Sequence, residues 1–270
     1  MKTYVKSGWS RTVQHFPVIA MLFLYQLLWG FFLFRAVEGV LVPLLKRYPD
    51  PLAAQGAVQL FLIEAQFQVM KTDVLVPYLW ALGGLFAVRM LLTPVINAGL
   101  FYSLQHATPE SGTKFFAGVR AAWGKVAAVY AAELLLMFAP LVWLVPLVAR
   151  ALAASDSWPA LGLAVVPALA CWLLGCLLIR LLSLGMQFGA AAGEPLLPSL
   201  RVTLRSLLPG AAAALAVWGI GLLVGLASSA ASIFLAGLFA LILHQAHHFF
   251  RTWFKVWMYA SQVAAWQSKR

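Results

Sequence analysis

Long apolar runs alternate with short polar gaps along the whole chain. Each run approaches or exceeds the roughly 20 apolar residues that cross a bilayer as a helix. The pattern predicts six membrane-spanning helices, over residues 16–42, 76–104, 126–152, 160–189, 211–227 and 232–250. Only small residues around 228–232 separate the last two runs. One helix over both would be too long for the membrane, so we expect a tight helical hairpin there.

Composition agrees with this interpretation. Hydrophobic residues make up 63% of the 270 residues and charged residues only 10%, with a mean hydropathy of +0.89. A soluble domain carries about a quarter charged residues. The expected fold is therefore an all-α polytopic membrane helix bundle forming one domain over 1–270, with the lipid bilayer as its main partner. We expect Cys171 and Cys176, five residues apart in one apolar run, to be small buried apolar residues.

The basic residues predict an orientation. The formal net charge is +11, but Lys and Arg are strung out between apolar runs instead of forming one basic face, so we expect no nucleic-acid partner. Twelve of them fall at the two termini and in the gaps after the second and fourth spans. The positive-inside rule makes that side cytosolic. We expect a multi-pass protein of the cell membrane with both termini in the cytosol, and the first apolar run retained as a span because it is too long for a signal peptide.

Three segments on that side share a second pattern. Apolar residues recur every four positions beside Lys or Arg over 5–13, 115–123 and 196–208. This spacing predicts short amphipathic helices in the headgroup plane. Each precedes a span, which favours a threefold repeat of interfacial helix and helical hairpin; the alternative is that any basic gap has this character. On the other side, we expect a helix over 53–70 that lies along the outer surface or caps the bundle; the alternative is a partner-binding surface.

Polar residues inside the spans are candidate functional residues, because ionisable groups are costly in lipid. The set is Arg89, Glu133, Arg180, His244, Gln26 and Asn97. Glu133 and Arg180 lie at similar predicted depth, so they should face one another. Arg89, near the middle of the second span, has no obvious partner in the sequence. These polar residues could line a path for a substrate or for protons, or they could only fix the packing of the helices.

Three histidines, His244, His247 and His248, occupy positions i, i+3 and i+4 of the last span and form what we call the histidine cluster. Imidazoles at this spacing share one helical face and can bind a transition metal or relay protons. The cluster lacks the glutamate of a zinc-protease helix. An aromatic and basic belt follows over 249–259, so the alternative is that these are ordinary interfacial residues and that the protein holds no cofactor.

Helix breakers and small residues complete the pattern. Four prolines fall inside predicted spans, where they can kink a helix: Pro94, Pro140, Pro146 and Pro167. Gly221 and Gly225 are four residues apart, and this small-xxx-small spacing permits close contact with another helix, most simply one within the bundle.

The arrangement of a basic interfacial segment before a hairpin, as at 118–125 and 199–210, resembles bacterial six-helix membrane proteins, including the membrane domains that precede glycerophosphodiester phosphodiesterases. The soluble catalytic domain of those enzymes is absent from this chain. The layout is also similar to the membrane subunits of ABC exporters, which would imply an ATPase partner or another membrane protein.

Three functions remain open. The first is a non-catalytic module that binds lipid or a partner and supports transport. The second is a transporter or exporter subunit with a polar intramembrane site. The third is a membrane-embedded enzyme or metal protein built on the histidine cluster. The sequence contains no phosphate-binding loop, dinucleotide fingerprint or nucleophile elbow, so we do not expect an enzyme.

Overall fold

The computed structural model describes residues 2–45, 76–106, 114–154, 157–234 and 238–270, with a few isolated residues between 56 and 63. Within this part of the chain every regular element is an α-helix. The all-α class is therefore confirmed. The predicted surface helix over 53–70 lies largely outside the described residues.

The chain divides into two compact units that share two helices. The smaller, Met21–Thr93, contains most of α2 (Phe16–Leu45) and the first part of α4 (Val76–Gln105). Within it, the Tyr78 hydroxyl donates to the Gly39 carbonyl at 3.2 Å, and Arg35 pairs with Glu38 three residues later at 3.0 Å. The boundaries between the two units fall inside α2 and α4. A single domain over 1–270 stays a prediction.

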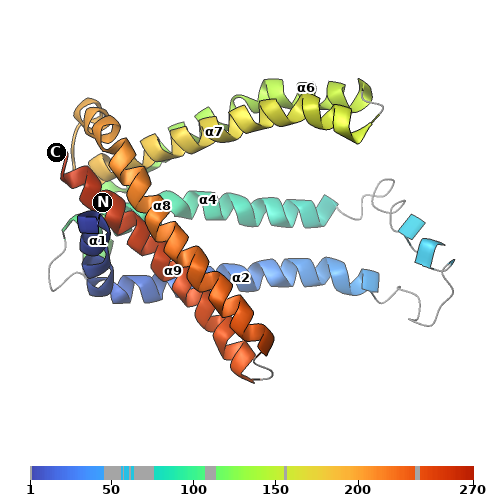
Figure 1. Cartoon of the computed structure of the whole chain (residues 1–270), viewed down its shortest axis with the longest axis horizontal. Helices are drawn as coiled ribbons and strands as arrows, with labels where there is room; N and C mark the ends of the chain where they lie inside the picture. The colour runs from blue at the N-terminus through green and yellow to red at the C-terminus, as the bar shows by residue number, and fades with distance from the viewer. Residues whose placement is uncertain are drawn as a thin grey trace. The chain divides into compact units, whose positions relative to one another are not determined.

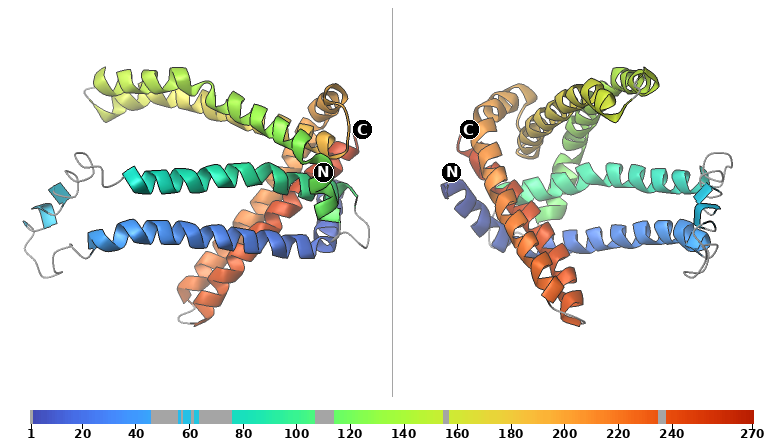
Figure 2. Two further views of the ribbon diagram at one scale, coloured as in Figure 1. Left: turned by 180° about the vertical axis from the view of Figure 1, so that it is seen from behind. Right: turned by 45° about the vertical axis from the view of Figure 1, so that its right-hand side comes forward.

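The larger unit contains residues 1–20 and 94–270. Its helices are α1 (Lys2–Gln14), α5 (Lys114–Phe138), α6 (Leu141–Ala154), α7 (Trp158–Ala191), α8 (Leu196–Phe234) and α9 (Leu238–Gln267), with the ends of α2 and α4. Helices α8 and α9 run side by side as a hairpin (Figures 1 and 2). The two helices predicted to pair at the end of the chain therefore do so, but the small residues 228–232, expected at the turn, are helical and lie within α8, and residues 235–237 between the helices are not described.

Five stretches are long and apolar enough to cross a membrane: Phe16–Gly39, Tyr78–Gln105, Lys114–Ala154, Pro159–Ala191 and Leu196–Ala231. They correspond in order to the first five predicted spans, as in a multi-pass membrane protein. The sixth, over 232–250, includes residues outside the described part of the chain. Six spans and a threefold repeat therefore remain predictions.

The structure differs from the sequence interpretation at the segments expected to lie in the headgroup plane. Only α1 is separate from the span that follows it, with His15 at the junction. The segments 115–123 and 196–208 are continuous with α5 and α8, because neither Gly124 nor Pro209 ends its helix. Pro140 does break the third predicted span, because α5 ends before it and α6 begins after it. On α7, Cys171 was expected to be buried but is exposed.

A short turn connects α7 to α8. Gly193 has φ 78°, a left-handed conformation that glycine adopts without strain. This lets the Glu194 N–H return to the Gly189 carbonyl at 3.0 Å, which satisfies a free carbonyl at the end of α7. Glu194 also pairs with Arg270 at 2.5 Å, so the turn is tied to the C-terminus.

Small residues line the places where helices approach most closely. Gly185 and Gly189 of α7 face Thr203 and Ser199 of α8, and a Cβ at either glycine would collide with them. Gly8 of α1 lies equally close to Ser261 of α9. Membrane helices pack in this way, through small residues that let backbones approach.

We call one end of the larger unit the basic end: α1, the last turns of α4, α5 as far as Glu133, α7 from Arg180 onward, α8 as far as Val217, and the second half of α9. Buried side chains concentrate here, including Phe101, Val126, Val217 and Trp266. By contrast, α6 has no buried residue. The basic end therefore contains the packed core that positions the polar residues described next.

Candidate functional site

A buried carboxylate is the centre of a polar network at the basic end. Glu133 of α5 is 3% exposed. Its Oε1 accepts from Arg180 Nη1 of α7 at 2.5 Å. Its Oε2 accepts from the Ser183 hydroxyl at 2.6 Å and from Gln187 Nε2 at 3.1 Å. Both oxygens of the carboxylate are therefore satisfied by donors from one helix, as a buried charge requires.

The network extends from this pair to two further helices. Asn97 of α4 donates to Gln187 Oε1 at 3.0 Å. The Tyr259 hydroxyl of α9 lies close enough to Arg180 to interact with its guanidinium. Polar contacts thus connect α4, α5, α7 and α9 through side chains that are mostly buried. Glu133, Arg180 and Asn97 were candidates from the sequence, and the structure brings these three together.

Two cationic side chains and an imidazole contact carbonyls at the end of α4. Arg11 Nη1 donates to the Leu104 carbonyl at 3.4 Å, Lys114 Nζ donates to the His106 carbonyl at 3.3 Å, and the buried His15 places Nε2 3.0 Å from the Ser103 carbonyl. The C-terminal end of a helix carries partial negative charge, so positive side chains stabilise it. Burial lowers the pKa of the Arg11 guanidinium, since desolvation disfavours its charged form.

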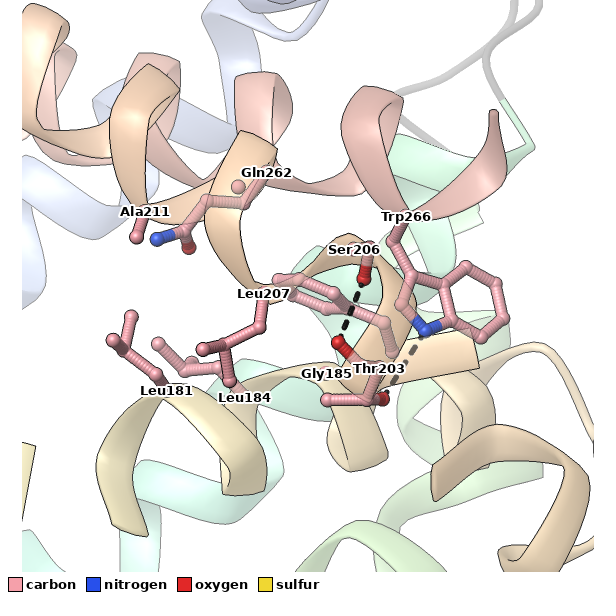
Figure 3. Close-up of a pocket in the computed structure, with 11 residues that line it drawn as sticks. Leu181, Leu184, Gly185, Thr203, Ser206, Leu207, Ala211, Gln262 and Trp266 are labelled. Carbon is pink, nitrogen blue, oxygen red and sulfur yellow. Dashed lines mark hydrogen bonds between the residues drawn. The ribbon is translucent and has the colours of Figure 1, made fainter. Parts of the chain in front are cut away.

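A small cavity lined by apolar residues and a few polar ones lies between α7, α8 and α9, beside the network (Figure 3). Its volume is about 30 Å³, close to the volume that one water molecule occupies in the liquid. The Gln262 side chain is 6% exposed, and its Oε1 has no hydrogen-bond partner. Figure 3 shows this amide at the cavity, with the Ser206 hydroxyl donating to the Thr203 carbonyl nearby. A site of this size can hold water but no larger molecule.

Two of the predicted residues lie in the smaller unit, and the side chain of a third is not described. Arg89 and Gln26 belong to the smaller unit, where Arg89 is exposed on α4 and its carbonyl accepts from Thr93 Oγ1 at 2.7 Å. Gln26 is half-buried on α2. The side chain of His244 is outside the described part of the chain.

The rest of the histidine cluster lies on α9. His247 is half-buried and His248 is exposed, with ring centroids 6.2 Å apart. His247 lies against Gly225 of α8, and Phe254 lies against Gly221, so the predicted small-residue contact is made within the chain. Among the described side chains, no group of three or more His, Cys, Asp or Glu could hold a metal ion. A metal at the histidine cluster stays a prediction because His244 was not among them.

The sequence interpretation missed Ser183, Gln187 and Tyr259. A signal was present for the first two: positions 180, 183 and 187 are three and four residues apart, so they share one face of an otherwise apolar helix. Tyr259 was assigned to the interfacial aromatic belt. In the structure it is 4% exposed and packs edge-on against Phe101 at a centroid distance of 5.5 Å.

The network contains an ion pair, amides and hydroxyls, all bonded to one another. This arrangement holds helices together without leaving a polar atom of Glu133 open to a ligand. Comparison with protein-family models, with curated proteins and with solved structures gave no match.

Proposed function

We propose that this protein is a non-catalytic multi-pass membrane protein whose basic end binds the headgroups of anionic phospholipids, as a lipid-binding module that supports transport. In this proposal the protein lies in the cell membrane with both termini in the cytosol. The basic end then lies at the cytosolic leaflet, where anionic lipids attract clustered Lys and Arg.

The exposed face of α8 is the observation that carries the proposal. Leu197, Leu204 and Leu208 are 81%, 58% and 79% exposed, and Arg201 and Arg205 are exposed between them. These positions share one helical face by their spacing. Leucines can enter the acyl region while the two guanidiniums bind phosphate oxygens at its border.

The opposite face of the same segment is polar and buried. Ser199, Thr203 and Ser206 are at most 6% exposed and pack towards α7 and α9. A helix in water would bury the leucines and expose the hydroxyls. In α8 the leucines are exposed and the hydroxyls are buried. This arrangement favours a lipid environment around α8, beginning at its first turns.

A second exposed face supports the same conclusion. On α5, Phe116 and Trp123 are 69% and 54% exposed, and Arg120 lies between them on the same side. Aromatic rings beside a guanidinium are typical of the membrane–water interface. Two separate helices of the basic end therefore present exposed apolar side chains together with arginines that can bind a phosphate group.

The test is a lipid-competition measurement on full-length protein in nanodiscs. Native mass spectrometry would compare retention of phosphatidylglycerol with phosphatidylcholine for wild type and for Arg201→Gln/Arg205→Gln. Because each basic residue contributes about 1 kcal/mol near an anionic surface, the double variant should lose roughly tenfold or more of its preference for the anionic lipid. The matched control, Arg35→Gln/Arg150→Gln, removes the same charge from the predicted opposite side and should keep that preference. Equal losses in both variants, or no preference in wild type, would refute the proposal.

Arg89 favours a second candidate function, the membrane subunit of a transporter. It lies well inside the stretch Tyr78–Gln105, it is exposed, and no carboxylate of the described residues lies within 4 Å of it. A guanidinium at such depth marks a water-filled path or a partner. The test is Arg89→Cys in a Cys171→Ala/Cys176→Ala background. A water-soluble maleimide should modify this cysteine if a path reaches it, whereas a lipid-facing cysteine would not react.

A further inference from the structure

An apolar groove lies between α6 and α7, away from the polar network. Its volume is about 370 Å³, and its walls come from the end of α5, from α6 and from the middle of α7. We call it the Pro140 groove; its lining includes Leu136, Pro140, Trp143, Trp172, Gly175 and Cys176. The volume falls within the range of sites that bind small molecules, which is about 300–1,000 Å³.

Two sequence features create the groove. Pro140 has no N–H and cannot continue the helix, so α5 ends at Phe138 and α6 begins at Leu141. On the facing helix, Gly175 presents no side chain, and a Cβ built there would meet nothing within 4 Å. The break on one wall and the missing side chain on the other leave a space that neither helix fills.

The lining is suited to hydrocarbon and to little else. None of its side chains is charged. The indole N–H of Trp172 is already used, because it donates to the Met137 carbonyl freed by the break, at 3.1 Å. A polar ligand would therefore lose its hydrogen bonds with water and regain few of them, whereas an apolar one would restore the dispersion contacts that an unfilled groove lacks.

The position of the groove determines how a ligand reaches it. Both walls belong to stretches that are long and apolar enough to cross a membrane, Lys114–Ala154 and Pro159–Ala191. At its rim, Trp143 is 79% exposed and Cys171 is also exposed. In a bilayer such a rim faces lipid, so the entrance is lateral and the molecules at the entrance are acyl chains.

We infer that the Pro140 groove binds one hydrocarbon chain of a membrane lipid. A protein cavity of roughly 150 Å³ takes up benzene, so the groove has room for a chain of about a dozen carbon atoms. A helix of a second copy is about 10 Å across and does not fit between two walls that leave this volume. The site does not depend on lipid binding at the basic end.

The test uses photo-crosslinking of the full chain in phosphatidylcholine nanodiscs, with a phosphatidylcholine that carries a diazirine in its acyl chain. Labelled peptides are mapped by mass spectrometry. Wild type should concentrate the label on the peptides that contain 136–147 and 168–179, above the level on other exposed faces of α7. Gly175→Leu should reduce that labelling several-fold because its side chain fills the space. Gly175→Ala adds only a methyl group, so it should reduce the labelling less and keeps the test valid if leucine disturbs folding.

The control is Gly162→Leu, on the same helix. A Cβ there also meets nothing within 4 Å, and Gly162 does not line the groove. It should leave the labelling unchanged. Labelling spread evenly over the exposed faces of α7, or an equal decrease in the two leucine variants, would overturn the inference. Oxidative crosslinking between Cys171 residues of two chains, with loss of the lipid label, would also overturn it, since a second copy would then cover the groove.

Discussion

Glu133 and Arg180 form the pair whose separation should change stability most. Glu133→Gln keeps the shape of the side chain but removes its charge, which leaves the guanidinium of Arg180 without a countercharge. The new amide also places an NH₂ group near donors that now bond the carboxylate. Arg180→Met has the complementary effect, because the carboxylate is then left with a hydroxyl and an amide.

The magnitude follows from burial. Removing one partner of a buried ion pair costs about 3–5 kcal/mol in soluble proteins. The Arg180 side chain is 32% exposed against 2% for Glu133, and unfolded helices in a membrane also find polar partners. We therefore expect about 2–3 kcal/mol for either single change. The double variant should be more stable than either single one, which requires a coupling energy that exceeds the cost of one change, about 3 kcal/mol.

The assay is reversible unfolding in mixed micelles with increasing dodecyl sulfate, followed by circular dichroism. The control cycle is Arg35→Met with Glu38→Gln, a pair that is exposed and three residues apart on one helix. Such a pair should show a coupling of only about 0.2–0.5 kcal/mol. If the effects at Glu133 and Arg180 add to within about 0.5 kcal/mol, the network does not stabilise the fold as argued.

Three further predictions test packing, topology and metal binding. Gly189→Leu should destabilise the protein by about 1–3 kcal/mol because its side chain would collide with α8, whereas Gly124→Leu, which meets nothing within 4 Å, should leave the unfolding midpoint unchanged or higher. Cysteines introduced as Arg120→Cys and Arg205→Cys, in a background without the native cysteines, should react with an impermeant maleimide from the same side of sealed vesicles; labelling from opposite sides would contradict the proposed topology. Elemental analysis of the purified protein should find less than one transition metal per chain, and stoichiometric zinc that disappears when the histidine cluster is changed to alanine would contradict the interfacial interpretation.

The hydrophobic pattern predicted the helices well because lipid imposes a simple rule. A segment must satisfy its own backbone hydrogen bonds across the membrane, so a long apolar run can only be a helix. The same reasoning predicted that Glu133 and Arg180 would face each other, since either charge alone would be costly. Both conclusions follow from burial energies large enough to outweigh local sequence preferences.

Local signals were weaker guides to where helices begin and end. Pro209 and Gly124 did not interrupt their helices, whereas Pro140 did, and all three residues are poor helix formers. The difference depends on what neighbouring helices can supply: at Pro140, Trp172 of α7 bonds the freed Met137 carbonyl. Such a contact joins residues 35 positions apart, so no local pattern could have predicted it.

The buried hydroxyl face of α8 has a consequence for how this protein can change over evolutionary time. Its leucines meet fluid chains that adapt to any apolar shape, so exchange among Leu, Ile, Val and Phe at Leu197 or Leu208 should be nearly neutral. Its hydroxyl side chains lie directly against the glycines of α7 with no free space between them, so even a single added methyl group at Gly189 should be selected against. In this chain the small, inconspicuous residues, and not the large apolar ones, should be the positions that homologous sequences keep fixed.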